Sequence, residues 1–154
     1  MSRAMDCPHC GCEIETKKGA PRSAPQLRRY FAMIRAVYHH WPESHERQFS
    51  SEEECRKWLQ MAAGHREVGA SIPLTGMSKE RAMMLAEAAI RAADAYATVV
   101  IHGDTLVIWR PKSIAFNRLS HLAACVLFDD VSSVIIAETG LIPAQLLKEQ
   151  ERAA

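Results

Sequence analysis

The sequence predicts an α+β protein that is mostly helical, with about five helices and one β-hairpin. Apolar residues recur at helical spacing along most of the chain. β-Branched and apolar residues gather instead in one short stretch, residues 98–109, on either side of the turn-forming sequence HGD. Because 48% of the 154 residues are apolar, we expect a real buried core.

The chain is expected to comprise a leader and linker over residues 1–21 and a single helical domain over residues 22–154. Gly19 and Pro21 resist both helix and sheet, which marks the end of the linker. No apolar run approaches the ~18 residues that span a bilayer, and the N-terminus lacks the apolar core of a signal peptide. We therefore expect a cytoplasmic protein with no membrane partner, whose five cysteines are reduced or metal-bound.

The first helix is expected over residues 24–41. Ser23 and Gln26 have the spacing of a capping box, and Pro25 is tolerated in the first turn. Pro42 ends the helix, because proline disfavours helical geometry in the residue before it. One apolar stripe is expected to face the core: Leu27, Phe31, Ile34, Tyr38 and Trp41.

Four more helices are expected, at residues 51–63, 78–96, 117–138 and from 143 onward. Ser51 and Glu54 form a second capping box, and Gly64 and Gly140 stand at helix ends. Residues 65–77 are expected to be irregular. The expected core face of the 117–138 helix consists of Leu119, Leu122, Ala123, Val126, Leu127, Val131, Val134 and Ile135.

The leader has the form of half a zinc knuckle. Cys7 and Cys10 are two residues apart and are followed by glycine, which allows both thiolates to bind one tetrahedral zinc; Cys12 is a candidate third ligand. A metal-free leader is the alternative. The fourth ligand would come from another subunit or from one of His9, His39, His40, His45 and Cys55.

The remaining chemistry-bearing residues suggest structural roles. His39, His40 and His45 could surround a second metal, but adjacent helical residues point about 100° apart, which favours histidines placed at a helix C-terminus. Cys55 and Cys125 lie on apolar faces and are expected to be core residues. No Ser/His/Asp arrangement, P-loop or GxGxxG sequence is present, so we expect no enzymatic activity.

The net charge of +1 conceals a basic segment, residues 17–42, which carries six Lys or Arg and no Asp or Glu. Arg28 and Arg35 are one heptad apart and can meet successive phosphates, while Tyr30 or Tyr38 could stack on unpaired bases. An ordinary solvated basic face is the alternative. The linker and the start of the helix add Lys17, Lys18 and Arg22 to the candidate nucleic-acid contacts.

Two short resemblances add a possible ligand. Residues 22–32, RSxxQxRRxFA, resemble the RSxxQNRxxWA segment of the NinB (Orf) family of phage recombination mediators, and residues 52–63 resemble that family's next helix; Leu27 departs from the pattern. Residues 111–121 and 140–147 are similar to an uncharacterised family of tailed-phage proteins. The NinB resemblance implies single-stranded DNA binding, a homodimer, and functional roles for Arg22, Gln26, Arg28 and Arg29.

Three functions remain open from the sequence. The first is a phage or prophage accessory protein that binds nucleic acid, with single-stranded DNA favoured, through the basic helix. The second is a small anti-CRISPR-like inhibitor that binds a host defence complex and has no catalytic activity. The third is a structural adaptor in which zinc joins two chains.

Overall fold

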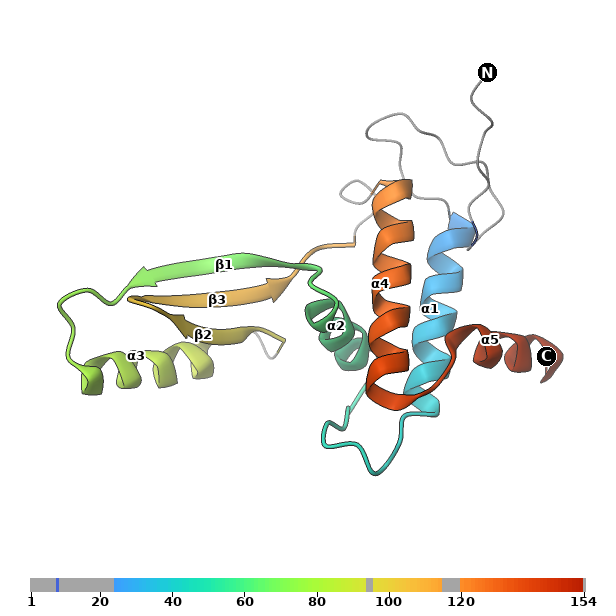
Figure 1. Ribbon diagram of the computed structural model, residues 1–154, viewed down its shortest axis with the longest axis horizontal. Coiled ribbons are helices and arrows are strands. Elements are labelled where there is room, and N and C mark those ends of the chain that lie inside the picture. The colour runs from blue at the N-terminus through green and yellow to red at the C-terminus, as the bar shows by residue number, and fades with distance from the viewer. Residues whose placement is uncertain (1–7, 9–23, 94–95, 115–119, 154) are drawn as a thin grey trace, which may run out of the picture. The chain divides into compact units, whose positions relative to one another are not determined.

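The computed structural model describes residues 8, 24–93, 96–114 and 120–153 (Figure 1). Its helices and small antiparallel sheet confirm a mostly helical α+β fold. The chain forms two compact units, a helical unit made of residues up to 63 with residues 113–154, and a sheet unit made of residues 64–112. Residues 22–154, expected to form a single helical domain, thus contribute to both units, and the expected boundary at residue 21 lies outside the described residues.

The helical unit contains α1 (Ala24–His39), α2 (Glu52–Ala62), α4 (His121–Thr139) and α5 (Pro143–Ala153). Ser51 caps α2 as predicted, since its hydroxyl accepts a hydrogen bond from the Glu54 backbone N–H at 3.1 Å. Gly140 ends α4 with a φ of 72°, a conformation that favours glycine. α1 and α4 run in the same direction side by side (Figure 1), and α5 packs across α1.

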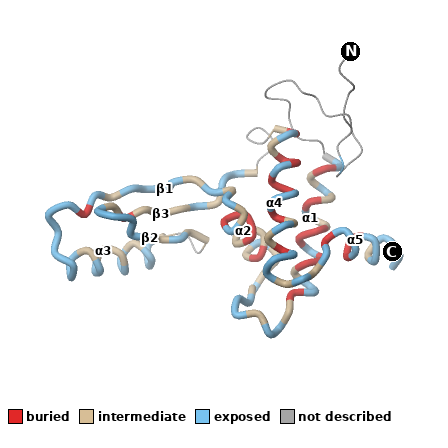
Figure 2. The backbone as a smooth tube through the Cα atoms, viewed as in Figure 1, coloured by how far each residue is buried: buried red, intermediate tan, exposed pale blue. Residues whose placement is uncertain are grey.

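The core of the helical unit lies between α1, α2 and α4 (Figure 2). Its α1 side chains differ from the predicted stripe, because Ile34 and Trp41 are buried as expected but Phe31 is 40% exposed. Leu27 and Tyr38 are only partly buried. Apolar residues occupy several neighbouring stripes of α1, and the packing against α4 selects the buried stripe, which contains Tyr30, Met33, Ile34, Ala36 and Val37.

The core face of α4 is also shifted from the prediction. Leu127, Val131 and Ile135 are buried as expected, whereas Leu122 and Val126 are exposed. Apolar side chains surround this helix on more than one face, so helical spacing alone does not identify the buried one. The predicted core residue Leu119 lies outside the described residues.

The sheet unit contains β1 (Arg66–Pro73), α3 (Lys79–Ala92), β2 (Thr98–His102) and β3 (Thr105–Pro111). The predicted hairpin is confirmed as β2 and β3, but the prediction that residues 65–77 are irregular is wrong. Residues 66–73 of this range form β1, which pairs antiparallel with β3 and makes β3 the central strand of the order β1-β3-β2. β1 is poor in apolar residues and contains a bulge between Val68 and Ala70, so its strand character depends on the pairing partner.

The sheet unit has a small interior. Leu106, in the central strand, is fully buried. No other residue of β1, β2 or β3 is buried. α3 contacts β2 but buries none of its own residues completely. Among the helices that the structure describes, none combines the length and apolarity needed to cross a bilayer.

Candidate functional site

The outward face of α1 carries Arg28, Phe31, Arg35 and His39, all exposed. Their spacing of three or four residues places them on one stripe of the helix. Arg28 and Arg35 are seven residues apart, which corresponds to about 10.5 Å along the helix axis. We name these four residues the α1 stripe.

A groove of about 300 Å³ lies beside the α1 stripe, between α1 and α2. Its lining consists of Phe31, Ile34, Glu52, Glu53 and Arg56. The Arg56 guanidinium carbon lies 5.8 Å from the centroid of the Phe31 ring, and its Nη1 donates to Gln60 Oε1 at 2.5 Å. The groove therefore has an exposed aromatic ring beside an oriented arginine.

One carboxylate on α2, that of Glu52, moderates the positive charge of the α1 stripe, whereas Glu53 pairs within α2. Glu52 Oε1 lies 3.4 Å from Arg35 Nε and 3.8 Å from His39 Nε2. Glu53 Oε1 lies 3.0 Å from Lys57 Nζ. The basic residues Arg35 and His39 thus lie next to Glu52 of the next helix, and the order of charges along the chain does not reveal this contact.

The two arginines near the start of α1 differ in burial. Arg28 is exposed and forms no ion pair with any residue in the described parts of the chain. Arg29 is partly buried, and its Nε atom is shielded from solvent with no hydrogen-bond partner among the described residues. Arg28 is therefore the more accessible cation.

Gln26 is placed in the core rather than on the surface. It is 2% exposed, and its Nε2 donates to the His121 carbonyl oxygen at 3.3 Å and to Cys125 Sγ at 3.1 Å. These hydrogen bonds join the first turn of α1 to the first turns of α4. The NinB resemblance implies that Gln26 contacts nucleic acid, but the buried side chain is not accessible to such a ligand.

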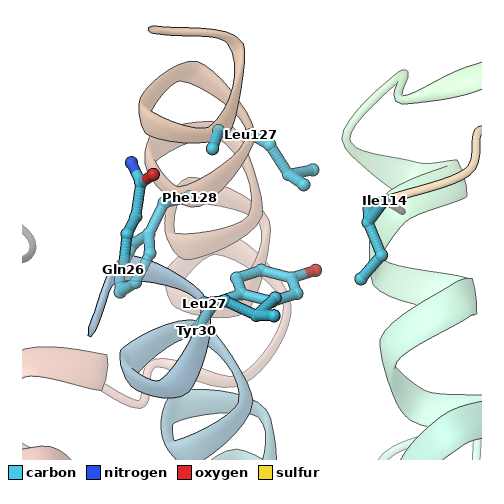
Figure 3. Close-up of a pocket in the computed structure, with 7 residues that line it drawn as sticks. Gln26, Leu27, Tyr30, Ile114, Leu127 and Phe128 are labelled. Carbon is cyan, nitrogen blue, oxygen red and sulfur yellow. The ribbon is translucent and has the colours of Figure 1, made fainter. Parts of the chain in front are cut away.

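Tyr30, proposed from sequence as a stacking residue, is buried beside a cavity of about 10 Å³ (Figure 3). Burial raises the pKa of its hydroxyl well above the usual range, and that hydroxyl has no hydrogen-bond partner among the described residues. Figure 3 shows the hydroxyl directed toward the side where Ile114 lies. A cavity of this size holds about one water molecule and excludes a nucleobase.

The zinc ligands predicted in the leader cannot be placed from the described part of the chain. Cys7, Cys10 and Cys12 lie outside the described residues, as do Lys17, Lys18 and Arg22. Residues 8, 24–93, 96–114 and 120–153 contain no group of three His, Cys, Asp or Glu side chains placed to hold a metal.

The clustered histidines serve separate contacts. His40 Nδ1 lies 2.8 Å from the Ala36 carbonyl oxygen, and His45 Nε2 lies 3.0 Å from Glu138 Oε2. Their different neighbours agree with structural roles.

The two described cysteines, Cys55 and Cys125, are buried core residues, as predicted, and neither is in a disulfide. Burial raises the pKa of Cys55 to about 12, with smaller contributions from Glu54 and Glu52. A thiol with so high a pKa stays protonated near neutral pH and is a poor nucleophile. Cys55 is therefore a packing residue.

Sequence reasoning missed two residues of the site. Phe31 was assigned to the core, and Arg56 was not singled out. The resemblance to NinB aligns Phe31 with a tryptophan. The sequence of an amphipathic helix does not show whether such an aromatic residue is buried or exposed.

No family model, curated protein or solved structure matches the chain.

Proposed function

We propose that the protein binds single-stranded nucleic acid through the α1 stripe and the adjoining groove. The observation that carries the proposal is the exposed ring of Phe31, which lies between Arg28 and Arg35 on one helical stripe. An aromatic ring flanked by cations can stack on an unpaired base while the cations contact the phosphates on either side.

Phe31 supplies the base-stacking surface in this proposal. Base–aromatic stacking contributes about 1–3 kcal/mol per base and tolerates every base, because each has a π face. The Arg56 guanidinium beside the ring can extend the planar surface or contact a phosphate. The groove of about 300 Å³ leaves space next to the ring for a flat ligand.

Arg28 and Arg35 supply the phosphate contacts. Arg28 has no described acidic partner to displace, whereas Arg35 must leave Glu52. Both side chains of the Arg35–Glu52 pair are well exposed, at 61% and 41%. Such surface pairs contribute about 0–1 kcal/mol, so a phosphate can replace the carboxylate at little cost.

The test is a titration of fluorescent oligo(dT) and of a duplex with the full chain at two salt concentrations. We expect preference for the single strand and weakening with salt. Replacing both Arg28 and Arg35 with alanine should lower affinity about tenfold and reduce the salt slope by about 1.4, since each single-strand phosphate contact contributes about 0.7.

The matched control replaces Arg81 and Arg91 with alanine, which removes the same charge from exposed positions on α3. Circular dichroism melts establish that both double variants are folded. Unchanged affinity of the Arg28→Ala/Arg35→Ala variant would remove the α1 stripe from the interface. A folded wild-type chain that binds neither probe at low salt would contradict the function and favour the protein-binding inhibitor class.

A further inference from the structure

One face of the sheet unit presents an aromatic residue among exposed aliphatic residues. The register pairs Trp109 with Val68 and with Thr98, and pairs Val107 with Val100. Trp109 and Val107 are two residues apart on β3 and therefore share a face. We name this surface the Trp109 face.

The two faces of the sheet differ in burial. Leu106, on the opposite face, is fully buried, whereas Val68 and Val100 on the Trp109 face are 49% and 43% exposed. Trp109 and Val107 are partly buried. The small interior of the sheet unit therefore lies on the Leu106 side, and the Trp109 face is left accessible.

A cation is already stacked on this face. The guanidinium carbon of Arg66 lies 4.8 Å from the centroid of the Trp109 ring, within the range of a cation–π contact. Arg66 is exposed and forms no ion pair with a residue in the described ranges.

Acidic residues are absent from the Trp109 face. Glu67 is the one acidic residue in β1, β2 and β3, whose residues are all described. It pairs in register with Arg110 on the other face, where Arg110 Nε lies 2.9 Å from its Oε1. The charge of the Trp109 face is therefore positive.

We propose that the Trp109 face is a second binding surface for single-stranded nucleic acid, with a base stacked on Trp109 and a phosphate held by Arg66. This inference deepens the function proposed for the α1 stripe and rests on it for the identity of the ligand. An open antiparallel sheet that carries an aromatic ring and an arginine, with no carboxylate, offers both the stacking surface and the charge that such a ligand requires.

The size of the face argues against a second copy of the chain as its occupant. Three strands spaced about 4.8 Å apart, with an average of about seven residues each at 3.3 Å per residue, present roughly 330 Å². A stable protein interface buries about 800 Å² on each partner. An area of roughly 330 Å² suits a few nucleotides better than a dimer contact.

The test measures binding of fluorescent oligo(dT) to the full chain carrying Trp109→Leu, Trp109→Phe or Arg66→Ala. Trp109→Leu keeps apolar bulk but removes the ring, and we expect about tenfold weaker binding. Trp109→Phe should retain most of the affinity, and Arg66→Ala should weaken binding about threefold. Ile101→Ala is the matched control, since Ile101 is an exposed apolar residue on the opposite face.

Photo-crosslinking to an oligonucleotide that contains 5-iodouracil provides a second readout, with peptide mapping expected to locate an adduct at Trp109. If Trp109→Leu proves unfolded by circular dichroism, Arg66→Ala and the crosslink decide the result. Loss of dimer mass in Trp109→Leu, with oligonucleotide affinity unchanged, would instead identify a contact between chains and overturn the inference.

The two binding proposals fail in different ways. Full affinity in Trp109→Leu and Arg66→Ala, with loss in the Arg28→Ala/Arg35→Ala variant, would overturn the Trp109 face and leave the α1 stripe. The reverse pattern would overturn the α1 stripe and leave the Trp109 face. A folded wild-type chain that does not bind would overturn both.

Discussion

Glu52 is the residue whose chemistry most directly opposes anion binding at the α1 stripe. Its carboxylate contacts both Arg35 and His39, so in the free protein it occupies the place that a phosphate would take. Removing the charge of Glu52 frees the Arg35 side chain and changes no residue of α1, the helix that carries Arg35. A substitution of Glu52 therefore tests whether Arg35 belongs to a binding surface or only to a solvated ion pair.

We expect Glu52→Gln to bind oligo(dT) about two- to fivefold more tightly, since an exposed ion pair of this kind is worth ~0.2–1 kcal/mol. Fluorescence anisotropy at low salt measures the change. Glu43→Gln removes the same charge from an exposed loop position and serves as the control. Equal or weaker binding of Glu52→Gln relative to the control would show that Arg35 does not reach the ligand.

Glu54 has a different role, which is to organise the start of α2. Its Oε2 accepts hydrogen bonds from the Ser50 hydroxyl at 2.7 Å and the Ser50 backbone N–H at 2.8 Å, and Arg47 Nη2 lies 3.2 Å from its Oε1. These contacts, led by the Ser50 hydroxyl, hold the pKa of the carboxyl below its usual value of 4.5. Because the folded-state pKa is lowered, the associated stability is present above pH 4.5 and is lost as the pH falls through the folded-state value.

Ser50→Ala should therefore raise the pKa of Glu54 toward 4.5. The variant should also be less stable than wild type at neutral pH, and the difference should shrink in acid, where the carboxyl is protonated in both proteins. Carbon-detected NMR titration of Glu54 and thermal melts at two pH values measure these effects, with Ser44→Ala as control. An unshifted Glu54 pKa would show that the Ser50 hydroxyl is not the main cause.

At the scale of elements, the pairing of α1 with α4 determines which α1 residues remain for binding. Gln26 hydrogen-bonds to α4 at one end of the pair, and the Ser132 hydroxyl lies 3.5 Å from Met33 Sδ further along. With these positions turned inward, Phe31 and the two exposed arginines are turned outward. The exposure of the α1 stripe is thus a consequence of core packing.

We expect Gln26→Ala to lower the free energy of unfolding by about 2–3 kcal/mol, because it removes buried hydrogen bonds and leaves a small cavity. Chemical denaturation measures this loss, and Gln145→Ala, at an exposed position on α5, should change little. The affinity of the folded variant for oligo(dT) should match wild type. A stable variant with weakened binding would restore Gln26 as a ligand contact.

Helix and strand boundaries show where local sequence signals suffice. Ser51, Ser120 and Gly140 mark helix ends through hydrogen bonds and backbone conformations that involve only neighbouring residues. β1 lacks such signals, since Gly69 interrupts it and few of its residues are apolar. Its formation depends on β3, which lies some forty residues further along the chain.

At the scale of the whole molecule, the helical unit and the sheet unit each present a basic surface with an exposed or partly exposed aromatic residue. Two such surfaces on one chain would bind a nucleic-acid strand more tightly together than either alone, provided that the strand can reach both. A variant that combines Arg28→Ala and Arg35→Ala with Trp109→Leu, compared with the single-surface variants, measures this coupling. Losses from the two single-surface variants that add in the combined variant would indicate that one strand engages both units, whereas a combined loss far larger than their sum would indicate two surfaces that bind separate strands.

The leader supplies the remaining whole-molecule prediction. If Cys7, Cys10 and Cys12 bind zinc, the purified full chain should contain about one zinc per chain, and Cys7→Ser with Cys10→Ser should abolish it. Cys125→Ala should retain zinc, because Cys125 lies in the helical core. Light scattering with and without chelator measures whether the metal also joins chains; zinc well below stoichiometry in intact protein would contradict the site.

The sequence alone determined the α+β class, the cap of α2 at Ser51, the end of α4 at Gly140 and the β2–β3 hairpin, because these depend on interactions between residues close in the chain. It also located the basic segment that contains Arg28 and Arg35. The tertiary structure decided that Phe31 faces outward, that Gln26 and Tyr30 face inward, and that Glu52 lies against Arg35. Those outcomes follow from which helices pack together, and the contacts between helices join residues distant in sequence, which no local pattern encodes.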